Sequence, residues 1–166
     1  MTIQEAMQAR HSVRSYKEKK IPEELVTRLN AEIEACNREG GLHIQLVTDE
    51  PHAFDGWMAH YGKFTGVRNY IALIGPESAR LEEQAGYYGE RLVLLAQTLG
   101  LNTCWVAMTF SKGAARQRCT IARGEKLACV IALGYGATQG VPHRSKPMEA
   151  LCEADGPLPE IGRAHV

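Results

Sequence analysis

Two stretches of the chain place apolar residues three and four positions apart, which is the spacing of an amphipathic helix. The first covers residues 22–38, has Pro22 in its first turn and stops at Gly40. The second covers residues 79–99, and its part from Leu92 to Ala96 is apolar all round. A helix without a polar face is buried in the core or at a subunit interface.

Four shorter apolar stretches predict strands, over residues 43–48, 70–74, 103–107 and 126–134. The last one is uniformly apolar from Leu127 to Leu133. A strand of this kind belongs in the centre of a sheet that is covered on both faces. Between the first two strands, residues 49–68 predict a polar and aromatic loop region.

Composition narrows the class of protein. The chain has 166 residues and 45% hydrophobic content, which suits one globular domain. Nineteen Lys and Arg balance nineteen Asp and Glu, which argues against a nucleic-acid or membrane partner. Without a hydrophobic signal region or a run of about 20 apolar residues, the chain is expected to be cytoplasmic. Its five cysteines include no C-x-x-C pair and are expected to be reduced and mostly buried.

Two cationic clusters stand far apart in this neutral chain. The first, Arg10-His11-Ser12-Val13-Arg14, follows a short helix that Thr2 and Glu5 can open as a capping box. The second is His143-Arg144-Ser145-Lys146, which comes after three closely spaced glycines. Guanidinium groups and a serine hydroxyl suit the oxygens of a phosphate, so the pattern indicates a localised anion site. Taken singly, each of these side chains is more often a solvated surface charge.

These segments, in their order along the chain, resemble the FMN-dependent nitroreductase family. The resemblance lies in residues 10–16, in Gly100-Leu101-Asn102-Thr103-Cys104-Trp105, and in Ile131-Ala132-Leu133-Gly134-Tyr135-Gly136 followed by the second cluster. The tract over residues 61–70 is similar to a small subgroup of the family. The resemblance covers most of the chain. It implies an α+β fold with a mixed, mostly antiparallel central sheet flanked by helices.

The resemblance also implies which residues bind FMN. Residues of the first cluster would contact the phosphate and ring oxygens, a loop after the third strand would lie against the isoalloxazine ring, and a late basic pair would close on the phosphate. The residues in these positions are Arg10, His11, Ser12 and Arg14, then Val106, Ala107 and Met108, then Arg144 and Lys146. Many relatives have glycine where this chain has Ala107 and Met108.

The implied activity is that of an FMN-dependent NAD(P)H oxidoreductase. NADH or NADPH would give a hydride to flavin N5, and a small-molecule acceptor such as a nitroaromatic or a quinone would take the electrons. No catalytic side chain or metal is required, and the chain has no hydrolase or zinc motif. The alternatives are a non-catalytic FMN-binding or storage module and a flavin-modifying relative. The protein is expected to be a homodimer or a single chain that imitates one.

The C-terminal residues carry a separate expectation. Residues 160–166 resemble the translation of a sequencing adapter, so we expect a flavin-binding domain over residues 1–159, incomplete at its C-terminus, and a non-native tail. Relatives continue into a helix and an amide-rich stretch at the flavin site. A chain without it is expected to be less stable, to bind FMN poorly and to be inactive.

Several further side chains have a structural rather than a functional interpretation. Aromatic residues outside the motifs are expected to pack in the core rather than to contact a cofactor. Glu90 is expected either at the solvent edge of its helix or paired with a cation. The aromatic residues are Trp57, Tyr61, Phe64, Tyr70, Tyr87 and Tyr88.

Overall fold

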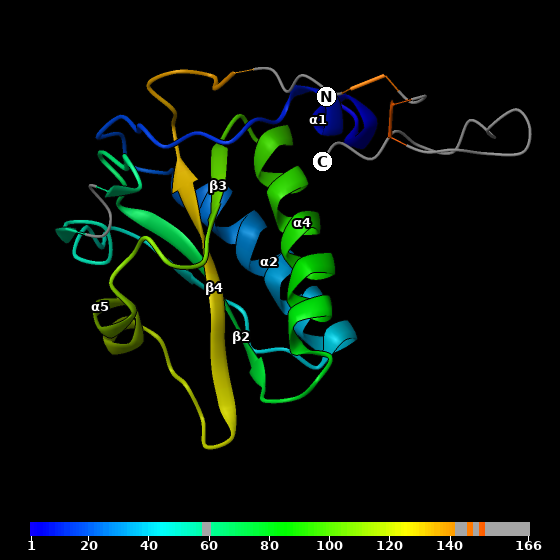
Figure 1. The fold of residues 1–166 in the computed structure, drawn as a ribbon, viewed down its shortest axis with the longest axis vertical. Helices are drawn as coiled ribbons and strands as arrows, with labels where there is room; N and C mark the ends of the chain where they lie inside the picture. Colours follow the sequence, from blue (N-terminus) through cyan, green and yellow to red (C-terminus); the bar gives the residue numbers. More distant parts are fainter. Residues whose placement is uncertain (58–60, 142–145, 148–149, 152–166) are drawn as a thin grey trace, which may run out of the picture.

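The structure is a computed structural model that describes residues 1–57, 61–141, 146–147 and 150–151. Within them the chain forms four helices and one four-stranded sheet (Figure 1). Every neighbouring pair of strands is antiparallel, in the order β1-β2-β4-β3. The expected antiparallel sheet with flanking helices is confirmed. The elements are α1 (Ile3–Ala9), α2 (Glu23–Gly40), β1 (Gln45–Val47), β2 (Asn69–Pro76), α4 (Leu81–Thr98), β3 (Asn102–Val106), α5 (Lys112–Arg118) and β4 (Glu125–Gly134).

The apolar strand β4 lies inside the sheet, as its sequence predicts. It pairs with β2 on one side and with β3 on the other. Val130 and Ile131, which point to opposite faces, are both fully buried. Leu92 of α4 is fully buried as well, so the apolar half of this helix lies in the core.

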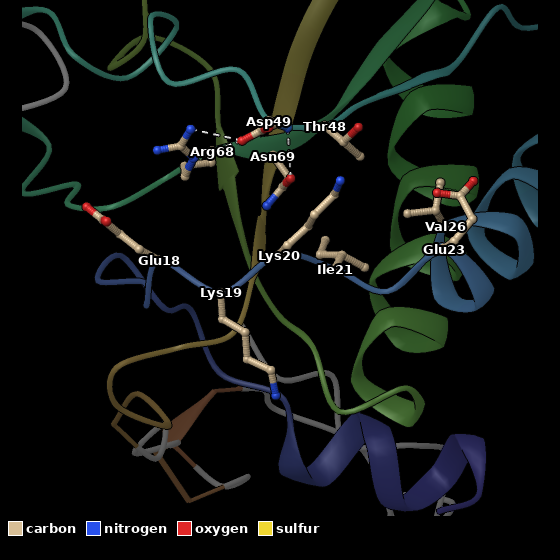
Figure 2. Close-up of a pocket in the computed structure, with 10 residues that line it drawn as sticks. All are labelled: Glu18, Lys19, Lys20, Ile21, Glu23, Val26, Thr48, Asp49, Arg68 and Asn69. Carbon is tan, nitrogen blue, oxygen red and sulfur yellow. Dashed lines mark hydrogen bonds and ion pairs between the residues drawn. The ribbon is translucent and has the colours of Figure 1, made fainter.

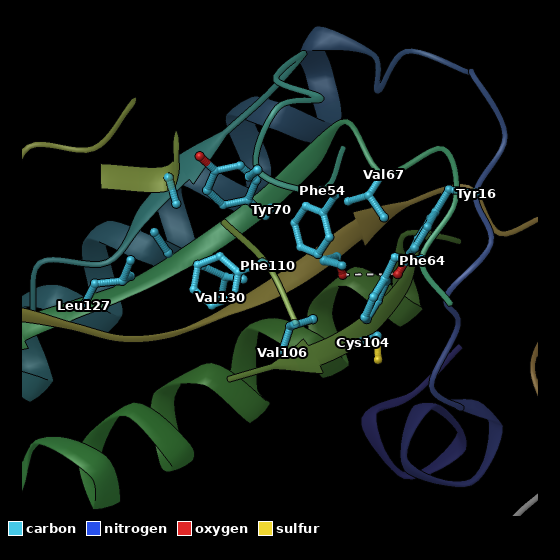
Figure 3. Close-up of a cluster of buried hydrophobic side chains, with 14 of the residues drawn as sticks. Tyr16, Phe54, Phe64, Val67, Tyr70, Cys104, Val106, Phe110, Leu127 and Val130 are labelled. Atoms are coloured by element: carbon cyan, nitrogen blue, oxygen red, sulfur yellow. Dashed lines mark hydrogen bonds between the residues drawn. The ribbon is translucent and has the colours of Figure 1, made fainter. Parts of the chain in front are cut away.

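Each face of the sheet has its own core. On one face, α2 and α4 pack against Ile71, Leu73, Ile131 and Leu133. On the other face, Tyr70, Val130 and their neighbours lie beneath aromatic side chains from the connecting segments (Figure 3). These covering side chains are Phe54, Phe64 and Phe110, and Ala115 of α5 joins them.

Some expectations are extended by this second core. The polar and aromatic loop region expected over residues 49–68 contributes to the core, because it buries Phe54, Phe64 and Val67. Helix α5 was not predicted, since Ala115 is its only buried residue and leaves no apolar stripe. Its N-terminus is instead capped by Ser111, whose hydroxyl accepts a hydrogen bond from the backbone of Ala114.

The first strand is shorter than expected. The prediction was residues 43–48, whereas β1 contains only Gln45–Val47. Backbone pairing with β2 continues beyond this range, because His43 N donates to Ile74 O at 2.8 Å. The side chain of Asn37 satisfies Ile44, which lies between His43 and β1, because it accepts from Ile44 N at 2.7 Å and donates to Ile44 O at 3.0 Å.

Helix starts and thiols follow the predictions more closely. Thr2 and Glu5 form the expected capping box at α1, with both hydrogen bonds present. Cys36 and Cys104 are buried free thiols, while Cys119 and Cys129 are half-buried. Of the described helices, none is both long and apolar enough to cross a lipid bilayer.

Candidate functional site

The first cationic cluster leaves the end of α1 in an extended conformation. Arg10 is the C-cap of α1, with φ −72° and ψ 134°. Val13 N then donates to Thr103 O of β3 at 3.0 Å, and Thr65 N donates to Arg14 O at 2.9 Å. The cluster therefore runs between β3 and the segment of residues 61–67.

Three of the predicted site residues surround one side chain of β3. Burial raises the pKa of the Cys104 thiol. The guanidinium of Arg14, the hydroxyl of Ser12 and the guanidinium of Arg10 each act in the opposite direction. Arg10, Ser12 and Arg14 thus lie close enough together to act on a single group.

Arg10 carries a hydrogen-bond donor that the described residues leave unused. Its Nε is buried and has no hydrogen-bond partner among them. Glu90 Oε1 is 3.9 Å away, which is too far for a hydrogen bond, while Glu90 Oε2 accepts from Trp105 Nε1 at 3.0 Å. Both alternatives for Glu90 are observed, because its side chain is 40% exposed and forms an ion pair with Arg10. A buried, unpartnered guanidinium nitrogen fits an anionic ligand, because such donors are rarely left unsatisfied.

A cavity of about 390 Å³ opens where β3 ends. It brings together four of the predicted site residues, Arg14, Val106, Ala107 and Met108. Arg14 and Lys63 give the cavity positive charge, and none of the described residues that line it is acidic. The other lining residues are Tyr61, Gly62, Phe64, Trp105 and Thr109.

The rim of this cavity exposes aromatic rings that were expected to pack in the core. Trp57 and Tyr61 are 78% and 76% exposed, and their rings stack on each other at 6.3 Å. The prediction was right for Phe64 and Tyr70, which are buried, and wrong for Trp57, Tyr61 and the exposed Tyr87. Tyr88 of α4 is half-buried, and its ring lies against Gly40 of α2.

The remaining predicted residues lie near the first cluster or outside the described part. His11 is half-buried, and a Cβ on Gly140 would be 2.7 Å from its Cβ. The chain just before the second cluster therefore lies against the first. Arg144 falls outside the described residues, and Lys146 is exposed and does not line the cavity.

A second cavity, of about 320 Å³, has balanced charges (Figure 2). Arg68 donates to Asp49 Oδ1 from Nε at 3.1 Å and from its terminal nitrogen at 2.9 Å. The Lys19 ammonium lies 4.1 Å from the centre of the Tyr135 ring and points away from Lys20. Three acids, Glu18, Glu23 and Asp49, offset its three cations. This balance makes the second cavity a poorer anion site than the first.

Sequence reasoning missed several residues of the first cavity. Lys63 and Thr109 received no role, and Tyr61 was assigned to packing. Residues 61–64 and 106–109 are far apart in the sequence and meet only in the folded protein. A Cβ added to Gly62 would lie 2.7 Å from Thr109 Oγ1. The available signal was the aromatic and basic tract over residues 61–70.

Comparison with known proteins assigns the family. The sequence profile of the family described as "Putative TM nitroreductase" matches residues 2–163. The chain belongs to this family. It is therefore an oxidoreductase of the nitroreductase type. A comparison with curated proteins found no match.

Solved structures share the fold at low sequence identity. A putative nitroreductase in complex with FMN from Desulfovibrio desulfuricans is 18% identical, with a TM-score of 0.71 over 96% of this chain and 99% of that chain. A putative NADH dehydrogenase/NAD(P)H nitroreductase from Parabacteroides distasonis is 22% identical, with a TM-score of 0.69 over 93% and 98%. An FMN-dependent nitroreductase from Clostridium difficile is 15% identical, with a TM-score of 0.68 over 91% and 98%.

Proposed function

We propose that this chain is an FMN-dependent NAD(P)H oxidoreductase that passes electrons to a nitroaromatic, a quinone or a similar small acceptor. The observation that carries the proposal is the acid-free cavity after β3, to which Arg14 and residues 106–108 contribute. Arg10, whose Nε has no hydrogen-bond partner among the described residues, pairs with Glu90, and Glu90 accepts a hydrogen bond from Trp105 in the cavity wall. The FMN complex of the Desulfovibrio relative supports the choice of cofactor.

Different residues would bind different parts of FMN. Arg10 would donate charge-assisted hydrogen bonds to phosphate oxygens, and the hydroxyl of Ser12 would donate one more. Arg144 and Lys146 complete this part of the site in the proposal. Gly140 supports their convergence, since it packs against His11 and Ser12 just before the second cluster.

Val106, Ala107 and Met108 line the ring side of the site. FMN, when bound, supplies the redox chemistry by taking a hydride from NADH or NADPH and giving electrons to the acceptor. Arg14 would provide a positive potential that stabilises negative charge on the reduced ring. No side chain of this chain needs to transfer a proton, so we assign no catalytic residue.

Anaerobic reduction tests the proposed activity. FMN-loaded protein is mixed with NADH or with NADPH without oxygen, and the visible absorbance of the flavin is followed. Loss of absorbance with one donor, and its return on addition of a nitroaromatic or a quinone, is the expected result. Stable absorbance with both donors would leave a non-catalytic FMN binder. Product analysis after aerobic turnover shows whether the flavin itself is modified.

A further inference from the structure

The cavity after β3 holds one cation that the FMN site does not require. Arg14 belongs to the first cationic cluster and lies 5.9 Å from the centre of the Phe64 ring. Lys63 comes from another segment, is exposed, and has no ion pair with any described residue. No acid among the described lining residues offsets its charge. Lys63 is therefore available to a second, negatively charged molecule.

Aromatic surface lies next to this cation. Tyr61 lines the cavity and stacks on Trp57, with an angle of 30° between the two rings. Met108, on the opposite segment, is 75% exposed. Large side chains that are this exposed and lie around one cavity are typical of a binding surface rather than of packing. The flat rings suit a planar aromatic molecule.

The backbone fixes Lys63 in an unusual conformation. Its φ is +58°, in the left-handed region that residues other than glycine rarely adopt. The preceding Gly62 packs closely on Thr109, so residues 61–64 are held against the far wall of the cavity. Strained backbone of this kind concentrates at ligand sites, where the surrounding structure enforces it.

We infer that Lys63, Tyr61 and Trp57 form the subsite for the electron acceptor, and that this subsite selects planar aromatic molecules that carry a negative charge. The inference rests on the proposed function, because only an oxidoreductase has an electron acceptor. Tyr61 and Trp57 provide the stacking surface, and Lys63 provides the charge.

Redox-inert probes isolate binding from turnover. We use 2-naphthoate and its neutral counterpart 2-naphthamide, titrated into flavin-free and FMN-loaded protein. Trp57 and Trp105 are the only two tryptophans of the chain. Trp105 lines this cavity and Trp57 stacks on Tyr61 in its wall, so tryptophan fluorescence reports occupancy of the cavity. The wild type is expected to bind 2-naphthoate about two- to fivefold more tightly than 2-naphthamide. A difference of this size is typical of an ion pair that is partly exposed to solvent.

Four variants test the roles. Lys63→Gln should make the two affinities equal, and Lys63→Arg should restore the preference. Tyr61→Leu should weaken both probes alike, because it removes stacking and leaves the charge. Lys126→Gln, a lysine that does not line this cavity, should change nothing.

The outcomes separate this inference from the proposed function. A preference for naphthoate that persists in Lys63→Gln would overturn the subsite, even if the protein binds FMN and is reduced by NAD(P)H. A preference that disappears in Lys63→Gln supports the subsite, including in a protein that never binds FMN, which would overturn the proposed function alone. Equal binding of both probes by the wild type would also overturn the inference.

Discussion

At the scale of single residues, the site depends on how Trp105 is held. Its indole nitrogen donates to Glu90, and its ring lies on α4 where Gly89 leaves room. A Cβ on Gly89 would come within 2.3 Å of the Trp105 ring. The same indole lines the cavity, so a glycine of α4 and a wall of the site are in direct contact.

Gly89→Ala should therefore destabilise the protein and disturb the cavity. We expect a loss of about 1–3 kcal/mol in the free energy of unfolding, the usual cost of overpacking a core. The matched control is Gly86→Ala on the same helix, where no atom lies within 4 Å of the added Cβ. Alanine there should stabilise the helix by about 0.5–1 kcal/mol. Urea denaturation measures the free energy of unfolding of both variants. Equal changes in the two would show that the Trp105 ring moves aside at little cost.

Some residues of the site can be predicted from the sequence and others cannot. Motif order pointed to Arg14 and to residues 106–108, and the fold brings them to one cavity. Lys63 and Tyr61 could not be found this way, because their role comes from a contact between segments about 45 residues apart. Their exposure is decided by tertiary packing, which places Phe64 inward and leaves Tyr61 outside.

At the scale of elements, helices and strands were predicted correctly where their apolar pattern extends over many residues. The helix expected over residues 22–38 is α2, Glu23–Gly40, and the strand expected over residues 126–134 is β4, Glu125–Gly134. Short elements failed for local reasons. Helix α5 has a capping serine but no apolar stripe, and β1 contains only Gln45–Val47 of the expected residues 43–48.

One contact between elements makes stability depend on pH. Glu125, at the start of β4, accepts a hydrogen bond from Ala122 N at 2.7 Å and lies 2.9 Å from His43 Nδ1. The hydrogen bond with His43, followed by that from Ala122, lowers the pKa of Glu125 from its ordinary value of 4.5. A lowered pKa in the folded state means that the carboxylate stabilises the fold above about pH 4.5 and loses this effect as pH falls further.

Glu125→Gln should remove that dependence. At pH 7 the wild type is expected to have the higher free energy of unfolding. The difference between wild type and variant should shrink as pH falls below 4.5, because both side chains are then uncharged. Denaturant titrations over this range measure the difference. A gap that stays constant down to the lowest pH would show that Glu125 is not stabilised as a carboxylate.

At the scale of the whole molecule, the fold joins segments that are distant in sequence into one site. The cluster after α1, the end of β3 and the segment of residues 61–64 meet on one side of the sheet. Gly140 brings the chain after β4 to the same place. We propose that this assembly binds FMN, with Arg10 as a phosphate ligand.

A fluorescence titration of flavin-free protein with FMN tests this claim most directly. Wild type is compared with Arg10→Ala and with the control Arg80→Ala, whose side chain is 75% exposed and lies outside the site. A charge-assisted bond to phosphate contributes about 1.5–3 kcal/mol, so Arg10→Ala should raise the Kd for FMN by about one to two orders of magnitude. Arg80→Ala should leave it unchanged. A wild type that does not bind FMN, or an Arg10→Ala variant that binds it equally well, would contradict the account.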